Sequence, residues 1–94
     1  MKTVWITGGS TGIGLATAKK FYTNNWRVII SSRNYEKLKY AKNEINKIND
    51  NKEVYILKCD ISYREEVHSI IDKIENEISS IDLAILNAAA YSPN

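Results

Sequence analysis

Residues 7–14, TGGSTGIG, contain all four glycines of the 94-residue chain. They lie between the apolar run at residues 4–6 and an amphipathic stretch, so we expect a turn that joins a strand to a helix. Glycine allows positive φ angles and lets the backbone approach a ligand closely. The N-terminus of a helix also favours a bound phosphate, because of its N–H groups and its dipole. The stretch therefore predicts a phosphate-binding turn, and a tight turn without a ligand is the alternative.

Outward from this turn, short apolar runs alternate with longer amphipathic stretches. The apolar runs lie at residues 4–6, 28–30, 54–57 and 83–86. Their apolar residues stand at odd and even positions alike, a pattern typical of parallel strands that are buried on both faces. Between the runs, apolar residues at spacings of three and four predict three helices. Their stripes are Leu15, Ala18, Phe21 and Tyr22; Leu38, Ala41, Ile45 and Ile48; and Val67, Ile70, Ile71, Ile74 and Ile78.

This order predicts the fold class. Strand and helix alternate three times before a fourth strand, which indicates an α/β fold with a Rossmann-type doubly wound parallel sheet in the order 3-2-1-4. Residues 1–94 are expected to form this single domain, which ends just after the fourth strand. We expect the first helix to end at Asn24-Asn25, because asparagine tolerates the left-handed conformation. The third is expected to begin at a capping box, Ser62 to Glu65.

Composition narrows the classes of function. The hydrophobic fraction is 44%, the charged fraction is 26% and the net charge is +2, so neither nucleic acid nor a membrane surface is an expected partner. No apolar run is long enough for a transmembrane helix, and the N-terminal residues do not resemble a signal peptide. The single cysteine, Cys59, excludes a disulfide framework. These features predict a cytoplasmic protein.

The glycine spacing, G-x-x-x-G-x-G, differs from the commonest dinucleotide fingerprint. It resembles the T-G-x-x-x-G-I-G signature of the short-chain dehydrogenase/reductase family. Two later segments are similar to that family in the same order. Asp60, in KCDIS, resembles the aspartate beside the adenine, and LNAAA at residues 86–90 resembles the N-N-A-G segment after the fourth strand. The resemblance covers the whole chain and implies the cofactor-binding half of an oxidoreductase that transfers hydride between nicotinamide and a carbonyl or alcohol.

The resemblance implies roles for residues at each matching position. Gly8 makes the turn, while Ser10 and Thr11 border the adenosine ribose and the phosphates. In addition, it places Gly12, Ile13 and Gly14 at the pyrophosphate, Asp60 and Ile61 at the adenine, and Asn87, Ala88 and Ala89 beside a ribose. For Asp60 the alternative is a turn or capping residue. Leu86 and Ala89 depart from the family pattern, and a methyl group at Ala89 is expected to crowd this corner of the site.

The segment Ser31–Asn34 bears on the choice of nicotinamide cofactor. An acidic residue at the end of the second strand binds the ribose 2′-hydroxyl of NAD in many dinucleotide folds. Here the sequence is SSRN, with no carboxylate. The guanidinium of Arg33 suits a 2′-phosphate instead. We therefore predict NADP(H), with a solvated arginine at a strand end as the alternative.

Catalytic residues are expected to be missing from these 94 residues. In the family a serine and a Y-x-x-x-K pair, which act in proton transfer, lie beyond the fourth strand. Tyr35 and Lys39 have that spacing, but they follow the second strand, beside the adenosine end of the cofactor, so we assign them no catalytic role. His68 and Cys59 lack partners at metal-ligand spacing and are interpreted as structural or surface residues.

Three functions remain open from the sequence. The chain is the cofactor-binding part of a reductase that is inactive alone, a non-catalytic module that senses NADP(H), or an interaction protein that keeps the fold. An apolar fourth strand without a further neighbour would leave an open edge. This predicts a homodimer in which the fourth strands of two copies, or their flanking segments, meet across a two-fold axis.

Overall fold

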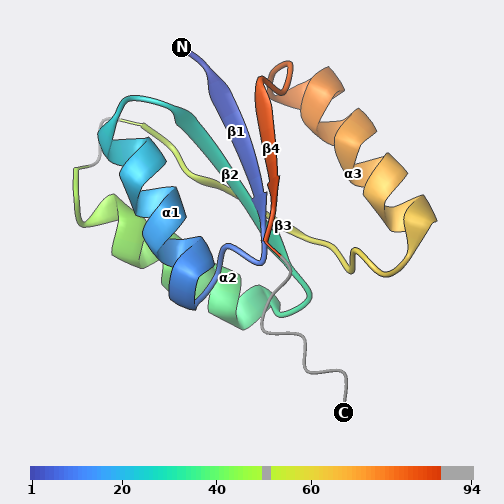
Figure 1. Cartoon of the computed structure of the whole chain (residues 1–94), viewed down its shortest axis with the longest axis horizontal. Helices are drawn as coiled ribbons and strands as arrows, with labels where there is room; N and C mark the ends of the chain where they lie inside the picture. Colours follow the sequence, from blue (N-terminus) through green and yellow to red (C-terminus); the bar gives the residue numbers. More distant parts are fainter. Residues whose placement is uncertain (50–51, 88–94) are drawn as a thin grey trace.

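A computed structural model describes residues 1–49 and 52–87 of the chain. Strands and helices alternate along this part of the chain, as the sequence predicts (Figure 1). They are β1 (Thr3–Thr7), α1 (Gly12–Thr23), β2 (Arg27–Ser32), α2 (Tyr35–Asn46), β3 (Tyr55–Lys58), α3 (Arg64–Glu77) and β4 (Leu83–Leu86). None of these helices is both long and apolar enough to cross a lipid bilayer.

The sheet has the predicted topology. Its four strands are parallel and run in the order β3-β2-β1-β4. In the register, Val4 of β1 lies between Val28 of β2 and Leu83 of β4. All strands point the same way, so the segments that follow them meet at one edge of the sheet, its carboxyl end. The residues predicted to bind the cofactor follow the strands at this edge.

Two helices cover one face of the sheet, and α3 lies on the other (Figure 1). The face under α1 and α2 carries the larger core. Its buried members are Val4, Ile6, Ala18, Tyr22, Val28, Ile30, Leu38, Ala41, Ile45 and Val54. On the α3 face, Trp5, Ile29 and Ile74 are buried, and the apolar residues around them are only partly buried. Apart from Ile48, the residues of the predicted stripes of all three helices thus pack against the sheet.

The strand burial differs from the prediction at the edges of the sheet. β1 is buried along its whole length, but in β4 both Leu83 and Leu86 are exposed. Among the described residues, β4 is hydrogen-bonded to β1 alone and forms one edge, as β3 forms the other. The apolar run at residues 83–86 therefore predicted the strand correctly but did not predict how buried it is. Two further limits were misplaced, because Val54 precedes β3 and Ile48 follows α2, where it is 40% exposed.

The helix ends test two sequence predictions. α1 ends as expected, since Asn24 is its C-cap residue and Asn25 has a φ of 68°, in the left-handed region. The capping box at Ser62 is wrong. α3 starts one residue later, with Tyr63 at the N-cap and no side-chain cap. The Ser62 hydroxyl instead donates to Asp60 Oδ1 at 2.6 Å, because the aspartate lies two residues before it in a turn.

Candidate cofactor site

The glycine turn joins β1 to α1 and adopts a conformation that requires glycine. Gly8 has a φ of 66° and Gly12 a φ of 56°, and side chains with a Cβ atom rarely occupy this region. A Cβ atom at Gly12 would meet no other atom within 4 Å. The backbone there faces open space at the start of a helix, where a phosphate is favoured. The turn therefore leaves backbone at the start of α1 accessible to a ligand.

Gly14 has a different role, because it lies in the first turn of α1 against the loop itself. A Cβ atom on Gly14 would collide with the Gly8 carbonyl and would stand 2.8 Å from Asn87 Nδ2. The Asn87 amide donates to the same carbonyl at 3.3 Å. Asn87 follows β4, so this bond ties the end of β4 to the glycine turn. Gly9 is similarly restricted, since a Cβ atom there would lie 2.6 Å from Ile30 Cγ2.

The end of β2 is held by a set of backbone bonds. The Gly8 N–H donates to the Ser31 carbonyl at 2.8 Å, and the Cys59 N–H donates to the Ser32 carbonyl at 2.9 Å. After Ser32 the chain turns into α2, where Asn34 Oδ1 caps the helix by accepting the Lys37 N–H at 3.1 Å. Arg33 lies in this turn and is exposed. It lines a surface hollow with Asn34, Tyr35, Glu36 and Lys37.

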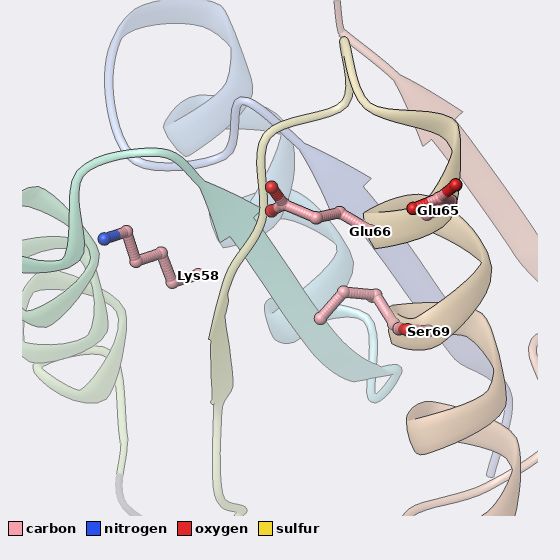
Figure 2. A pocket seen from close by; sticks show the side chains of 5 residues that line it. Lys58, Glu65, Glu66 and Ser69 are labelled. Atoms are coloured by element: carbon pink, nitrogen blue, oxygen red, sulfur yellow. The ribbon is translucent and has the colours of Figure 1, made fainter.

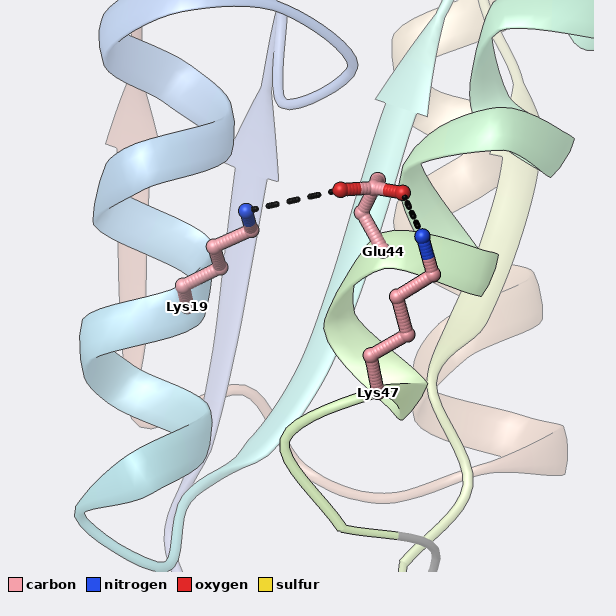
Figure 3. A network of polar contacts seen from close by, with 3 residues as sticks. All are labelled: Lys19, Glu44 and Lys47. Carbon is pink, nitrogen blue, oxygen red and sulfur yellow. Dashed lines mark hydrogen bonds and ion pairs between the residues drawn. The ribbon is translucent and has the colours of Figure 1, made fainter.

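Basic side chains differ in whether an acidic side chain already pairs with them, and an unpaired one is better able to bind a phosphate. Lys39 pairs with Glu36 at 3.2 Å. Between α1 and α2, Glu44 contacts Lys47 at 2.7 Å and Lys19 at 3.9 Å (Figure 3). The hydrogen bond from Lys47, together with the charges of both lysines, lowers the pKa of Glu44. Within residues 1–49 and 52–87, by contrast, Arg33 forms no salt bridge.

Asp60 occupies the loop after β3, where its carboxylate closes a turn. Asp60 Oδ1 accepts the Ser62 N–H at 3.0 Å and the Ser62 hydroxyl at 2.6 Å. These two bonds, with a smaller contribution from the charge of Arg33, lower the pKa of Asp60. The structure thus shows the turn role that the sequence offered as the alternative. It also brings Asp60 into electrostatic range of Arg33, across the ends of β2 and β3.

The remaining predicted residues surround this edge to different extents. Ser10 is buried and Thr11 is the N-cap residue of α1, without a side-chain capping bond. Ile13 and Ile61 are exposed by 78% and 46%. Ile13 lies in the first turn of α1 and Ile61 in the loop after β3, so each exposes an apolar side chain at the carboxyl end of the sheet. Ala88 and Ala89 lie outside the described residues.

A second hollow lies between the end of β3 and the start of α3 (Figure 2). Its lining consists of Lys58, Glu65, Glu66, Ser69 and Ile70. In Figure 2, Glu66 extends from α3 toward the loop after β3, and its Oε1 accepts the Asp60 N–H at 3.0 Å. No sequence pattern predicts this bond, because a surface glutamate has no characteristic motif. It fixes the loop that carries Asp60, and we assign this hollow no ligand.

Four residues to which the sequence assigned no catalytic or metal-binding role have ordinary surroundings. Lys39 lies 5.6 Å from the centre of the Tyr35 ring and pairs with Glu36, while His68 is exposed on α3. Cys59 is buried, and burial, followed by the charges of Glu66 and Asp60, raises the pKa of its thiol. In the part of the chain that the structure describes, no cluster of histidine, cysteine and acidic side chains is placed to hold a metal ion.

Comparison with known proteins agrees with this geometry. The family model for short chain dehydrogenase matches residues 2–94, so the chain belongs to the short-chain dehydrogenase family. It is 37% identical over 92 residues to 3-oxoacyl-acyl-carrier-protein reductase FabG of Rickettsia typhi, covering 97% of this chain and 34% of that protein. It is 34% identical over 88 residues to an uncharacterized oxidoreductase of Mycobacterium bovis, covering 93% of this chain and 26% of that protein.

A solved structure extends the similarity to three dimensions. YwfH, described as an NADPH dependent reductase involved in bacilysin biosynthesis, superposes with a TM-score of 0.91 at 29% sequence identity. The match covers 99% of this chain and 39% of YwfH. The chain thus spans about a quarter to two fifths of the length of these three proteins. The family and the fold predicted from the sequence are confirmed.

Proposed function

We propose that these 94 residues form the NADP(H)-binding portion of a short-chain dehydrogenase/reductase-type oxidoreductase. One observation carries the proposal: an open glycine turn and the exposed Arg33 both lie at the carboxyl end of the sheet. When bound, the nicotinamide of such a cofactor supplies hydride transfer to or from a carbonyl or alcohol. The residues described here hold the adenosine and phosphate end of the cofactor.

The glycine turn is assigned to the pyrophosphate. Gly8 makes the left-handed turn, and the backbone of Gly12 and Ile13 faces the ligand, since nothing would contact a Cβ atom at Gly12. Gly14 keeps α1 close to the loop. Ser10 and Thr11 border the ribose and the phosphates. Ile61 and Asp60 flank the adenine, and Asn87 supports the turn through its bond to the Gly8 carbonyl. Ala88 and Ala89 would complete the ribose side.

Arg33 is assigned to the 2′-phosphate that distinguishes NADP(H) from NAD(H). No carboxylate stands among residues 31–34, where an acidic residue would repel this phosphate. The nearest acid along the chain, Glu36, is paired with Lys39 at 3.2 Å. A guanidinium binds phosphate through charge-assisted, geometrically matched hydrogen bonds. The NADPH dependence stated for YwfH supports the same assignment.

Calorimetric titration with both cofactors tests this proposal. We expect NADP⁺ to bind about tenfold or more tightly than NAD⁺, because one charge-assisted phosphate contact is worth over 1 kcal/mol. Arg33→Asp should reverse the preference. As a matched control, Lys73→Asp makes the same change of charge on the exposed surface of α3 and should leave it unchanged. Equal or tighter binding of NAD⁺ to the unmodified chain would contradict the assignment.

We also propose that the 94 residues bind the cofactor without turning over a substrate. Tyr35 and Lys39 are the only tyrosine and lysine at Y-x-x-x-K spacing among these residues. They lie on α2 at the adenosine side, and Lys39 is engaged by Glu36. Carbonyl reduction assayed with NADPH and a panel of aldehydes and ketones should therefore show no activity. Turnover that is lost in Tyr35→Phe would overturn this view.

The free edge of β4 supports association with a second copy. In the part of the chain that the structure describes, β4 pairs only with β1, and Leu86 is 69% exposed. An open edge with apolar side chains favours pairing with another strand, so we propose a dimer in which two β4 strands meet antiparallel across a two-fold axis. Sedimentation equilibrium should show this dimer, and Leu86→Lys should weaken it. Tyr40→Lys, at an exposed position of α2, is the control, and a monomer at high concentration would refute the proposal.

A further inference from the structure

A tryptophan in the core is hydrogen-bonded to β2, the strand that leads into the segment Ser31–Asn34. Trp5 Nε1 donates to Ser31 Oγ at 3.0 Å. The two residues lie on neighbouring strands, and their exposed fractions are 2% and 1%. The indole ring packs with Ile29 and Ile74 on the α3 face of the sheet. Packing alone would be served by any large apolar ring, but the indole N–H adds a directional bond.

Ser31 connects this bond to the glycine turn. Its carbonyl accepts the Gly8 N–H at 2.8 Å, and Gly8 has the positive φ on which the turn depends. The next residue, Ser32, accepts the Cys59 N–H, and Arg33 follows directly. Ser31 is therefore held from the core by Trp5 and in turn holds the residue at which the turn begins.

From these contacts we infer that Trp5 and Ser31 form a positioning pair for the cofactor site. The bond between them fixes the end of β2, and with it the Gly8 amide and the segment that presents Arg33. A buried N–H group strongly requires an acceptor, so the indole restricts where the Ser31 hydroxyl can lie. Every buried side-chain nitrogen and oxygen atom in the described residues has a hydrogen-bond partner. The role in cofactor binding rests on the proposed function, whereas the linkage from Trp5 to Gly8 does not.

Amide hydrogen exchange tests the linkage in the intact chain. Ser31→Ala removes the acceptor, and Trp5→Phe removes the donor while retaining an aromatic ring. Each should increase exchange at the Gly8 amide about tenfold relative to the amide of Val28, the second residue of β2. Ser31→Thr keeps the hydroxyl and should stay close to the unmodified chain. The double variant should resemble either single variant, since both single changes remove the same bond.

Cofactor affinity provides the second measurement. Ser31→Ala should weaken NADP⁺ binding roughly three- to tenfold, and Ser31→Thr should restore it. Trp26→Phe is the matched control. Trp26 packs against Phe21 with ring centres 4.9 Å apart and lies just before β2, at the opposite end of that strand from Ser31. This change should alter neither Gly8 exchange nor affinity.

Each outcome decides between the alternatives. If Ser31→Ala leaves Gly8 exchange unchanged, or increases it equally at Val28, the positioning role is overturned and the bond serves only global stability. Should Trp5→Phe fail to fold, the comparison of Ser31→Ala with Ser31→Thr decides the question alone. Absence of NADP⁺ binding to the unmodified chain would contradict the proposed function, while Gly8 exchange still decides whether the linkage exists.

Discussion

The two ends of the parallel sheet are built on different principles. At the amino end, hydrogen bonds from side chains join the starts of the strands to one another. The Asp82 carboxylate accepts the Thr3 N–H at 2.7 Å, and Arg27 Nη1 donates to Thr3 Oγ1 at 3.1 Å. At the carboxyl end, the backbone itself forms the surface, with left-handed glycines at positions 8 and 12 and an open approach at Gly12.

Tyr22 is the centre of a group of polar contacts at the amino end. The Tyr22 hydroxyl lies 2.8 Å from the Asn49 carbonyl and 2.9 Å from the Lys52 carbonyl and shares its single proton between them. The Lys52 ammonium returns to the Tyr22 carbonyl at 3.0 Å and lies 4.2 Å from the centre of the tyrosine ring. This end satisfies its own polar groups, so changes here should affect stability. Changes at the carboxyl end should affect binding.

The largest effect is expected for Gly14→Ala, which places a methyl group against the Gly8 carbonyl. The Gly8 backbone and the Asn87 amide leave little room for relaxation, so the turn or α1 must move. We expect affinity for NADP⁺ to fall by more than about tenfold and the free energy of unfolding to fall by about 2–3 kcal/mol. Calorimetric titration and urea denaturation measure the two quantities.

Gly12→Ala provides the matched comparison for this change. It adds the same methyl group where no atom lies within 4 Å, at a φ of 56°. Its cost in stability should therefore be limited to backbone strain of about 1 kcal/mol. Equal stability losses for both variants would show that Gly14 is not the point of close contact between α1 and the turn.

At the amino end, Tyr22→Phe is expected to reduce stability without changing binding. The substitution removes the hydroxyl that reaches the carbonyls of Asn49 and Lys52, and such a loss costs about 1–2 kcal/mol. Urea denaturation should detect it, whereas Kd for NADP⁺ should remain the same. Tyr40→Phe, on the exposed side of α2, should change neither. An altered Kd in Tyr22→Phe would contradict the claim that the amino end affects stability alone.

The smallest effect concerns Asp60 and pH. Hydrogen bonds from Ser62 hold the pKa of Asp60 below its ordinary value of 3.8. A lowered pKa means that the ionised carboxylate stabilises the fold at neutral pH and that this contribution is lost as the pH falls below about 4. The unmodified chain should thus lose slightly more stability than Asp60→Asn when thermal unfolding is followed from pH 5 to about pH 3. Asp72→Asn, at an exposed position of α3, should behave like the unmodified chain.

The fold followed from the sequence because its signals are local and repeated. Apolar runs and helical stripes gave the order of elements, and right-handed crossovers then fixed the strand order. The start of α3 was predicted wrongly because the Ser62 hydroxyl had two possible partners. It could accept a backbone N–H of the helix or donate to Asp60, and the bond to Asp60 formed. The exposure of β4 was missed because it depends on which elements lie beside the strand.

The site was predicted in part, for a similar reason. The glycines and Arg33 can be recognised as candidate site residues by residue type alone, and the strand ends bring them to one edge of the sheet. The bonds from Trp5 to Ser31, from Asn87 to the Gly8 carbonyl and from Glu66 to the Asp60 N–H join residues that lie far apart or in unremarkable sequence. Only the three-dimensional arrangement reveals them.

Binding of the adenosine end of the cofactor tests the central claim most directly. Calorimetry with 2′,5′-ADP and with 5′-AMP isolates the 2′-phosphate from the nicotinamide half of the molecule. If Arg33 binds this phosphate beside the glycine turn, 2′,5′-ADP should bind about tenfold or more tightly, with a difference that shrinks as salt is added. Equal affinities for the two nucleotides would contradict the claim that this edge of the sheet is built for NADP(H).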